Sequence, residues 1–148
     1  MMKPLGVAGV LLLLLPLCPA QETAGSSAKV IIRLLNGKTG KPIRRHDTAN
    51  VWLGDGDNQL LQTGPKGEIT IDASNVRPSE IRFLPNTYFD CRFQRDGTSG
   101  RYVKYSVEQI ISKGIVGENS CGETHISPTP GVLVVYVRPR TFIEGMKL

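Results

Sequence analysis

Short runs of β-branched and aromatic residues, separated by glycine and proline, constrain the fold of this chain most strongly. In one such run Ile69 and Ile71 alternate with the polar Glu68, Thr70 and Asp72. Alternation with a period of two is typical of a strand that buries one face. Gly and Pro clusters separate similar extended segments, which we expect at residues 30–35, 49–53, 60–63, 81–84, 88–93 and 102–105.

Residues 132–137 form the most apolar stretch after the first twenty residues. Continuous apolarity, in place of alternation, is typical of a strand that is covered on both faces. We therefore expect this segment to be a central strand.

One short helix is predicted at residues 107–113. Ser106 is a good N-cap, with Gln109 three residues later, and Gly114 suits a helix end. Because seven residues are too few for a stable isolated helix, we expect it to dock through Val107, Ile110 and Ile111.

About seven short strands and one short helix predict a mainly β fold, an Ig- or prealbumin-like antiparallel β-sandwich. The length of 148 residues is suitable for one such domain. We expect the sandwich to occupy residues 29–148, with a C-terminal extension from about residue 92.

The first twenty residues differ from the rest of the chain. Lys3 precedes an apolar run at residues 5–17, and Pro19-Ala20 lies before the polar Gln21. This pattern is typical of a cleaved secretory signal peptide, and residues 21–28 read as a flexible leader. We therefore expect a secreted or periplasmic protein, with no later segment that could span a membrane.

Cys91 and Cys121 are the two cysteines that follow the predicted signal peptide. An even number of cysteines in an oxidising compartment favours a disulfide, which would close a loop of 30 residues. A metal or redox pair is the alternative, but the sequence has no CxxC spacing and no clustered histidines to favour it.

The formal net charge is +5, from 18 Lys and Arg against 13 Asp and Glu. Because the basic residues are scattered and the chain is predicted to be exported, we do not expect nucleic acid as a partner.

Residues 29–90 resemble the carboxypeptidase regulatory-like domain, a prealbumin-type sandwich related to carbohydrate-binding-like modules. The matching segments are residues 29–35, Gly40-Lys41-Pro42-Ile43, residues 49–53 and residues 63–71. Arg44-Arg45-His46 stands where the family often has small residues, and residues 92–148 exceed a minimal module. The resemblance implies a non-catalytic accessory or binding domain.

Four aromatic residues, Trp52, Tyr88, Tyr102 and Tyr105, are candidate ligand-binding residues, because aromatic faces can stack on a sugar. Packing in the core is the default interpretation of these residues, and stacking on a ligand is the rival one.

The sequence offers no clear catalytic or metal site. Asp55, Asp57 and Asn58 carry oxygen ligands suited to calcium, yet a polar hairpin explains them equally well. His46 and His125 lie in no nucleophile-and-base motif. We therefore predict no catalytic residue, no metal and no cofactor.

The C-terminal tail, residues 138–148, mixes basic and apolar residues. It is suited either to docking a protein partner or to folding back over a sheet edge.

Taken together, the sequence predicts an exported, non-enzymatic binding or structural module that acts on an extracytoplasmic protein or glycan. A carbohydrate-binding module and a small secreted hydrolase are the alternatives.

Overall fold

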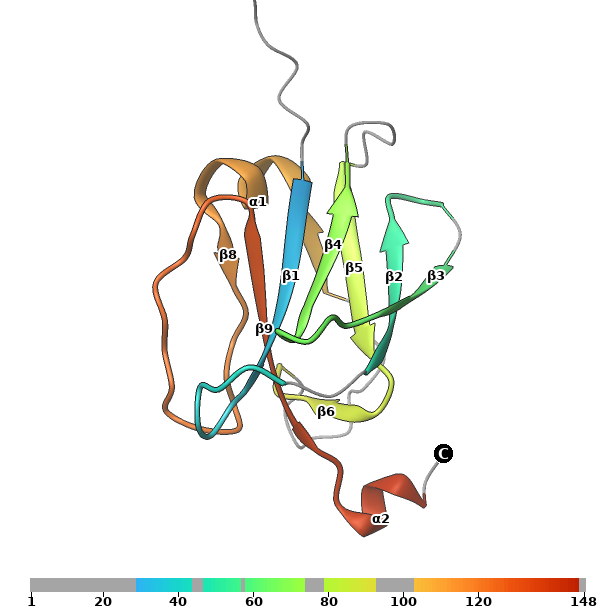
Figure 1. The fold of residues 1–148 in the computed structure, drawn as a ribbon, viewed down its shortest axis with the longest axis vertical. Helices are drawn as coiled ribbons and strands as arrows, with labels where there is room; N and C mark the ends of the chain where they lie inside the picture. The colour runs from blue at the N-terminus through green and yellow to red at the C-terminus, as the bar shows by residue number, and fades with distance from the viewer. Residues whose placement is uncertain (1–28, 44–46, 57, 74–78, 93–102, 147–148) are drawn as a thin grey trace, which may run out of the picture.

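The computed structural model describes residues 29–43, 47–56, 58–73, 79–92 and 103–146 (Figure 1). Residue Tyr102 and the predicted signal peptide and leader lie outside these residues. The elements, in chain order, are β1 (Lys29–Asn36), β2 (Thr48–Leu53), β3 (Asn58–Gln62), β4 (Glu68–Asp72), β5 (Glu80–Pro85), β6 (Tyr88–Asp90), β7 (Lys104–Ser106), α1 (Val107–Lys113), β8 (Ile115–Val116), β9 (Val132–Pro139) and α2 (Phe142–Gly145).

The strands form two sheets, which confirms the predicted β-sandwich. One sheet has the order β4-β1-β9-β6, with β8 also paired to β9, and the other has the order β3-β2-β5-β7. The segment predicted as a central strand is β9, and it does lie in the interior of its sheet.

The sandwich is mixed, whereas the sequence pattern predicted an antiparallel sandwich. β1 pairs with β9 in parallel, with Ile31 opposite Val132 and Asn36 opposite Val137. β8 also pairs with β9 in parallel. A parallel pair needs a long crossover connection, and here most of the chain lies between β1 and β9. Apolar and polar side chains alternate along a strand in the same way whether its neighbour is parallel or antiparallel, so the sequence pattern cannot reveal the parallel pairing.

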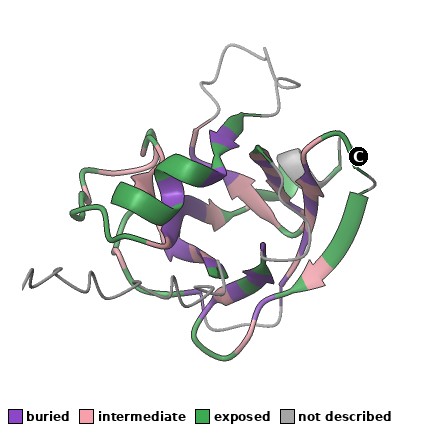
Figure 2. Ribbon diagram, turned by 90° about the horizontal axis from the view of Figure 1, so that it is seen from above, coloured by how far each residue is buried: buried purple, intermediate pink, exposed green. Residues whose placement is uncertain are grey.

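The continuous apolarity of β9 follows from its two covered faces. Leu133, Val135 and Val137 belong to the main core between the sheets. Val134 and Tyr136, on the opposite face, form a second cluster with Cys91. Figure 2 shows the buried residues concentrated in the strands, while α1 presents an exposed face to solvent.

The helix α1 has the predicted bounds. Its N-cap Ser106 accepts a hydrogen bond at Oγ from the backbone N–H of Gln109 (3.3 Å). Val107 and Ile110 are buried as expected, but Ile111 is 38% exposed, so the prediction that it docks the helix was wrong. Ile111 directly follows the buried Ile110, and a neighbouring position on a helix points in a different direction.

No helix in the described part of the chain has both the length and the apolar character needed to cross a membrane.

Candidate functional site

The three candidate aromatic residues that the structure describes lie in different surroundings. Trp52 is half-buried on the outer face of β2, where the Arg82 guanidinium lies 6.0 Å from the ring centroid. Tyr88 lines a groove at one end of the sandwich. Tyr105 is 6% exposed and belongs to the main core. These three side chains therefore do not form one stacking surface.

Tyr105 takes part in a buried polar network. Arg92 donates to the Tyr105 hydroxyl, to the backbone oxygen of Phe83 (3.0 Å) and to the Asp90 carboxylate. Burial lowers the pKa of Arg92, but hydrogen bonding and attraction to Asp90 more than offset this, so its pKa lies above the ordinary value. Burial also raises the pKa of Tyr105, although Arg92 opposes that shift. This network joins β6 of one sheet to β5 and β7 of the other.

The predicted disulfide between Cys91 and Cys121 is confirmed, with the two Cα atoms 5.3 Å apart. Cys91 directly follows β6, and its backbone N–H donates to Tyr136 of β9 (2.9 Å). The Asn119 side chain, near Cys121, donates to the Gly37 oxygen after β1 (2.9 Å). The bridge therefore attaches the loop that covers the second cluster to the sheet.

A row of amide side chains crosses the outer face of the β3-β2-β5-β7 sheet. Asn58 donates to Asn50 (2.7 Å), Asn50 donates to Asn86 (2.5 Å), and Asn86 donates to the Thr48 hydroxyl (3.3 Å). Trp52 follows Asn50 by two residues on β2, so its side chain lies on the same face.

The candidate metal and catalytic residues gain no further support. Asp55 is exposed, Asn58 is bonded to Asn50, and Asp57 and His46 lie outside the described residues. His125 is exposed in the loop between β8 and β9. Within the described ranges, His, Cys, Asp and Glu form no group of three that could hold a metal ion.

Asp47 is a buried carboxylate directly before β2. It is 1% exposed, and within the described part of the chain neither carboxylate oxygen has a hydrogen-bond partner. Its backbone N–H donates to the Thr63 hydroxyl (2.9 Å), which positions the start of β2. We assign no function to Asp47.

An open groove of about 1010 Å³ lies at the end of the sandwich where β1 and β9 finish. We call it the distal groove. Its lining residues are Asn36, Thr39, Lys41, Pro42, Ile43, Thr87, Tyr88, Pro139 and Arg140. These residues come from the turn after β1, the β5–β6 turn and the end of β9, so the parallel pairing of β1 and β9 brings them together.

The distal groove is basic. It contains Lys41 and Arg140, and the described residues that line it include no Asp or Glu. A second, smaller groove of about 520 Å³ differs in containing a carboxylate, Glu68, which accepts from Arg33 (2.9 Å) beside Lys66. The positive charge of the distal groove is therefore not neutralised by its own lining.

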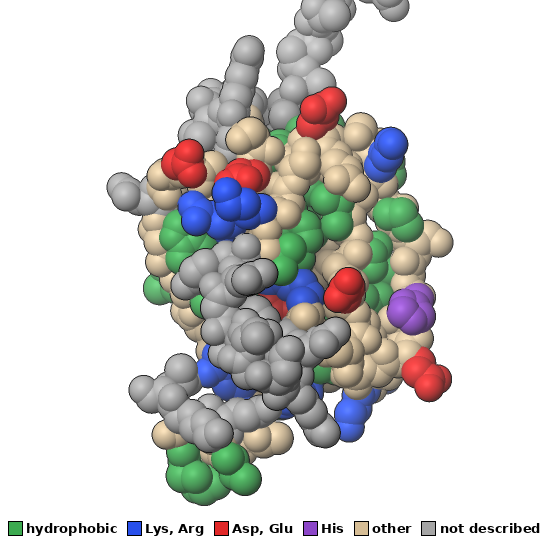
Figure 3. Space-filling view, turned by 180° about the vertical axis from the view of Figure 1, so that it is seen from behind, with side chains coloured by type: hydrophobic (Ala, Val, Ile, Leu, Met, Phe, Trp, Pro, Cys, Tyr) green, Lys and Arg blue, Asp and Glu red, His purple; other side chains and the backbone are tan. Residues whose placement is uncertain are grey.

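The short helix α2 extends away from the sandwich (Figure 1) and begins two residues after Arg140, which lines the distal groove. Phe142 is 81% exposed, and Ile143 and Met146 are each 63% exposed. Figure 3 shows this apolar cluster at the foot of the molecule, with basic side chains above it. Of the two interpretations of the tail, folding back over a sheet edge is therefore wrong for Phe142 and Ile143. We call the distal groove and these three apolar side chains together the distal surface.

Comparisons with protein-family models, with curated proteins and with solved structures gave no match.

Sequence reasoning identified Arg140 and Phe142 as parts of a tail, but it missed Lys41 as a functional candidate. Lys41 was noted only within the turn motif Gly40-Lys41-Pro42-Ile43. No local signal could have joined Lys41 to Arg140, because only the pairing of β1 with β9 brings the two residues to one end.

Proposed function

We propose that this protein is an exported, non-catalytic binding module that docks an extracytoplasmic partner protein through the distal surface. The observation that carries the proposal is the exposure of Phe142, Ile143 and Met146 next to a basic groove. Large exposed apolar side chains that gather in one place are typical of interaction sites, whereas single exposed ones are common and need no explanation.

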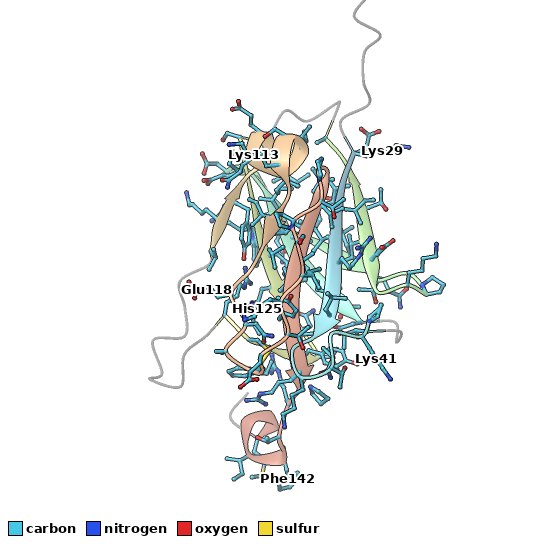
Figure 4. All side chains as sticks on the ribbon, turned by 90° about the vertical axis from the view of Figure 1, so that its left-hand side faces the viewer. Lys29, Lys41, Lys113, Glu118, His125 and Phe142 are labelled. Carbon is cyan, nitrogen blue, oxygen red and sulfur yellow. A yellow bond between two sulfur atoms is a disulfide. The ribbon has the colours of Figure 1, made fainter. Side chains whose placement is uncertain are left out.

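The position of the distal surface supports this role. Lys29 and Lys113 lie at one end of the molecule, and Lys41 and Phe142 lie toward the other (Figure 4). β1 therefore begins at the end of the sandwich opposite the distal surface. Aromatic, Met and Arg side chains, which interfaces favour, are all present there.

Export is part of the proposal and is supported by two features. Residues 1–20 have the pattern of a signal peptide, and a disulfide is most stable outside the reducing cytosol.

The test compares partner capture by the exported protein and by the double variant Phe142→Ser/Ile143→Ser. Leu60→Ser is the matched control, because Leu60 is 62% exposed on the edge strand β3, which contributes no residue to the distal surface. We expect the double variant to lose a specific partner that the wild type and Leu60→Ser both retain. Equal capture by all three proteins would contradict the proposal.

A carbohydrate-binding module is a second candidate, favoured by the amide row beside Trp52. Sugars are bound by aromatic faces together with hydrogen-bonding side chains, and Trp52 shares its sheet face with Asn50 and Asn86. A glycan array screened with the wild type, Trp52→Ala and Asn50→Ala tests this candidate. If the wild type binds a glycan and both substitutions abolish that binding, the carbohydrate-binding role is favoured over protein docking at the distal surface.

A further inference from the structure

We propose that the distal groove binds an acidic segment of the partner protein, with carboxylates placed at Lys41 and Arg140 and apolar side chains placed against the groove wall. This inference rests on the proposed function and assigns the ligand chemistry of the same surface.

The first argument is the contrast among the basic side chains. Arg33, Arg92 and Lys104 each form an ion pair, with Glu68, Asp90 and Glu80 respectively. Lys41 and Arg140 form no such pair with any residue whose side chain the structure describes, a set that leaves out Glu144, and both line one groove. A ligand with negative charge would supply the missing partners.

The second argument is that both cations are attached to ordered backbone. The Nε atom of Arg140 donates to the backbone oxygen of Tyr88 (3.4 Å), and its remaining N–H groups can donate to a ligand. The backbone oxygen of Lys41 accepts from the Asn36 N–H (2.9 Å), and the Lys41 N–H donates to the Thr39 hydroxyl (3.4 Å). Prior ordering lowers the entropic cost of binding.

The third argument is the mixed lining, which favours a peptide over a purely charged polymer. Pro42, Ile43, Tyr88 and Pro139 line the same groove and provide apolar contact area, and Thr39 and Thr87 provide hydroxyls. Phe142 extends the apolar area beyond the groove. A segment in which acidic and apolar side chains alternate would meet both kinds of lining at once.

The test measures binding of a fluorescein-labelled peptide of alternating Glu and Leu residues to the exported protein by fluorescence anisotropy. A matched peptide of alternating Gln and Leu residues removes the charge. The protein variants are Lys41→Gln, Arg140→Gln and the double variant. Lys113→Gln is the control, because it removes the same charge at the opposite end of the molecule (Figure 4). Circular dichroism establishes that each variant is folded.

We expect the acidic peptide to bind and the neutral peptide to bind more weakly. Each single substitution in the groove should lower the affinity about threefold and the double substitution about tenfold, as for exposed ion pairs. Lys113→Gln should leave the affinity unchanged, and added salt should weaken binding to the wild type.

Three results would overturn the inference. The first is equal affinity for the two peptides, and the second is an equal loss of affinity in Lys113→Gln and in the groove variants. The third is binding to heparin or to phosphatidylglycerol vesicles through Lys41 and Arg140, without binding to the acidic peptide. If the protein does not bind the acidic peptide but partner capture still depends on Phe142 and Ile143, the ligand assignment is wrong and the proposed function stands. If partner capture also does not depend on Phe142 and Ile143, both the ligand assignment and the proposed function are wrong.

Discussion

Arg92 donates from Nε to both carboxylate oxygens of Asp90, at 2.8 and 2.9 Å, where the two side chains are only 4% and 1% exposed. The pair lies directly beside Cys91 and connects the two sheets through Phe83 and Tyr105. Breaking a buried pair leaves one charge without compensation, which costs more than removing both charges.

We therefore expect Arg92→Met to lower the free energy of unfolding by about 3 to 5 kcal/mol. The double variant Asp90→Leu/Arg92→Met should recover most of this loss, because no unpaired charge remains. Urea unfolding of the wild type and both variants measures the difference. A double variant less stable than Arg92→Met would contradict this account of the pair.

The raised pKa of Tyr105 predicts a loss of stability at alkaline pH. Burial favours the neutral phenol, so its pKa is higher in the folded chain than in the unfolded chain. The stabilising contribution is fully present below the unfolded value of about 10 and declines as the pH rises through the folded value. Urea unfolding at about pH 8 and about pH 11 should show a larger decline for the wild type than for Tyr105→Phe. Equal declines would exclude Tyr105 as the cause.

Removing the disulfide should weaken the fold without changing its architecture. The bridge closes a loop of 30 residues, so Cys91→Ser/Cys121→Ser should lose about 3 to 4 kcal/mol of unfolding free energy. Thermal and urea unfolding measure this loss, and far-ultraviolet circular dichroism should retain its β signature. Reduced wild-type protein should behave like the double variant. Titration of two free thiols in protein purified without reductant would contradict the pairing.

Gly114 ends α1 at a position that tolerates no side chain. Its φ is +76°, and a Cβ atom there would lie 2.1 Å from the backbone oxygen of Thr129. We expect Gly114→Ala to cost at least about 2 kcal/mol, from the unfavourable dihedral angle and the contact with backbone. Gly64→Ala is the control, since its Cβ would meet only an ordinary contact at 3.6 Å. Chemical unfolding that finds both variants equally stable would contradict this prediction.

The sequence by itself determined the elements that depend on neighbouring residues. Alternation located strands such as β4, the Ser106 cap and Gly114 located α1, and continuous apolarity marked β9 as a central strand. Even the disulfide followed from the count of cysteines and the predicted compartment. Each of these signals depends either on a few neighbouring residues or on the composition of the chain, so each can be recognised in the sequence alone.

Only the tertiary structure decided which distant residues meet. The parallel pairing of β1 with β9 places Lys41 beside the same groove as Arg140, and the pairing of β5 with β7 brings Tyr105 toward Arg92. It also separated Trp52 from Tyr88 and Tyr105, which the sequence had grouped by residue type. The direction of each strand and the strand with which it pairs depend on the packing of whole sheets. Side-chain periodicity is the same for every possible pairing and direction, so it cannot distinguish them.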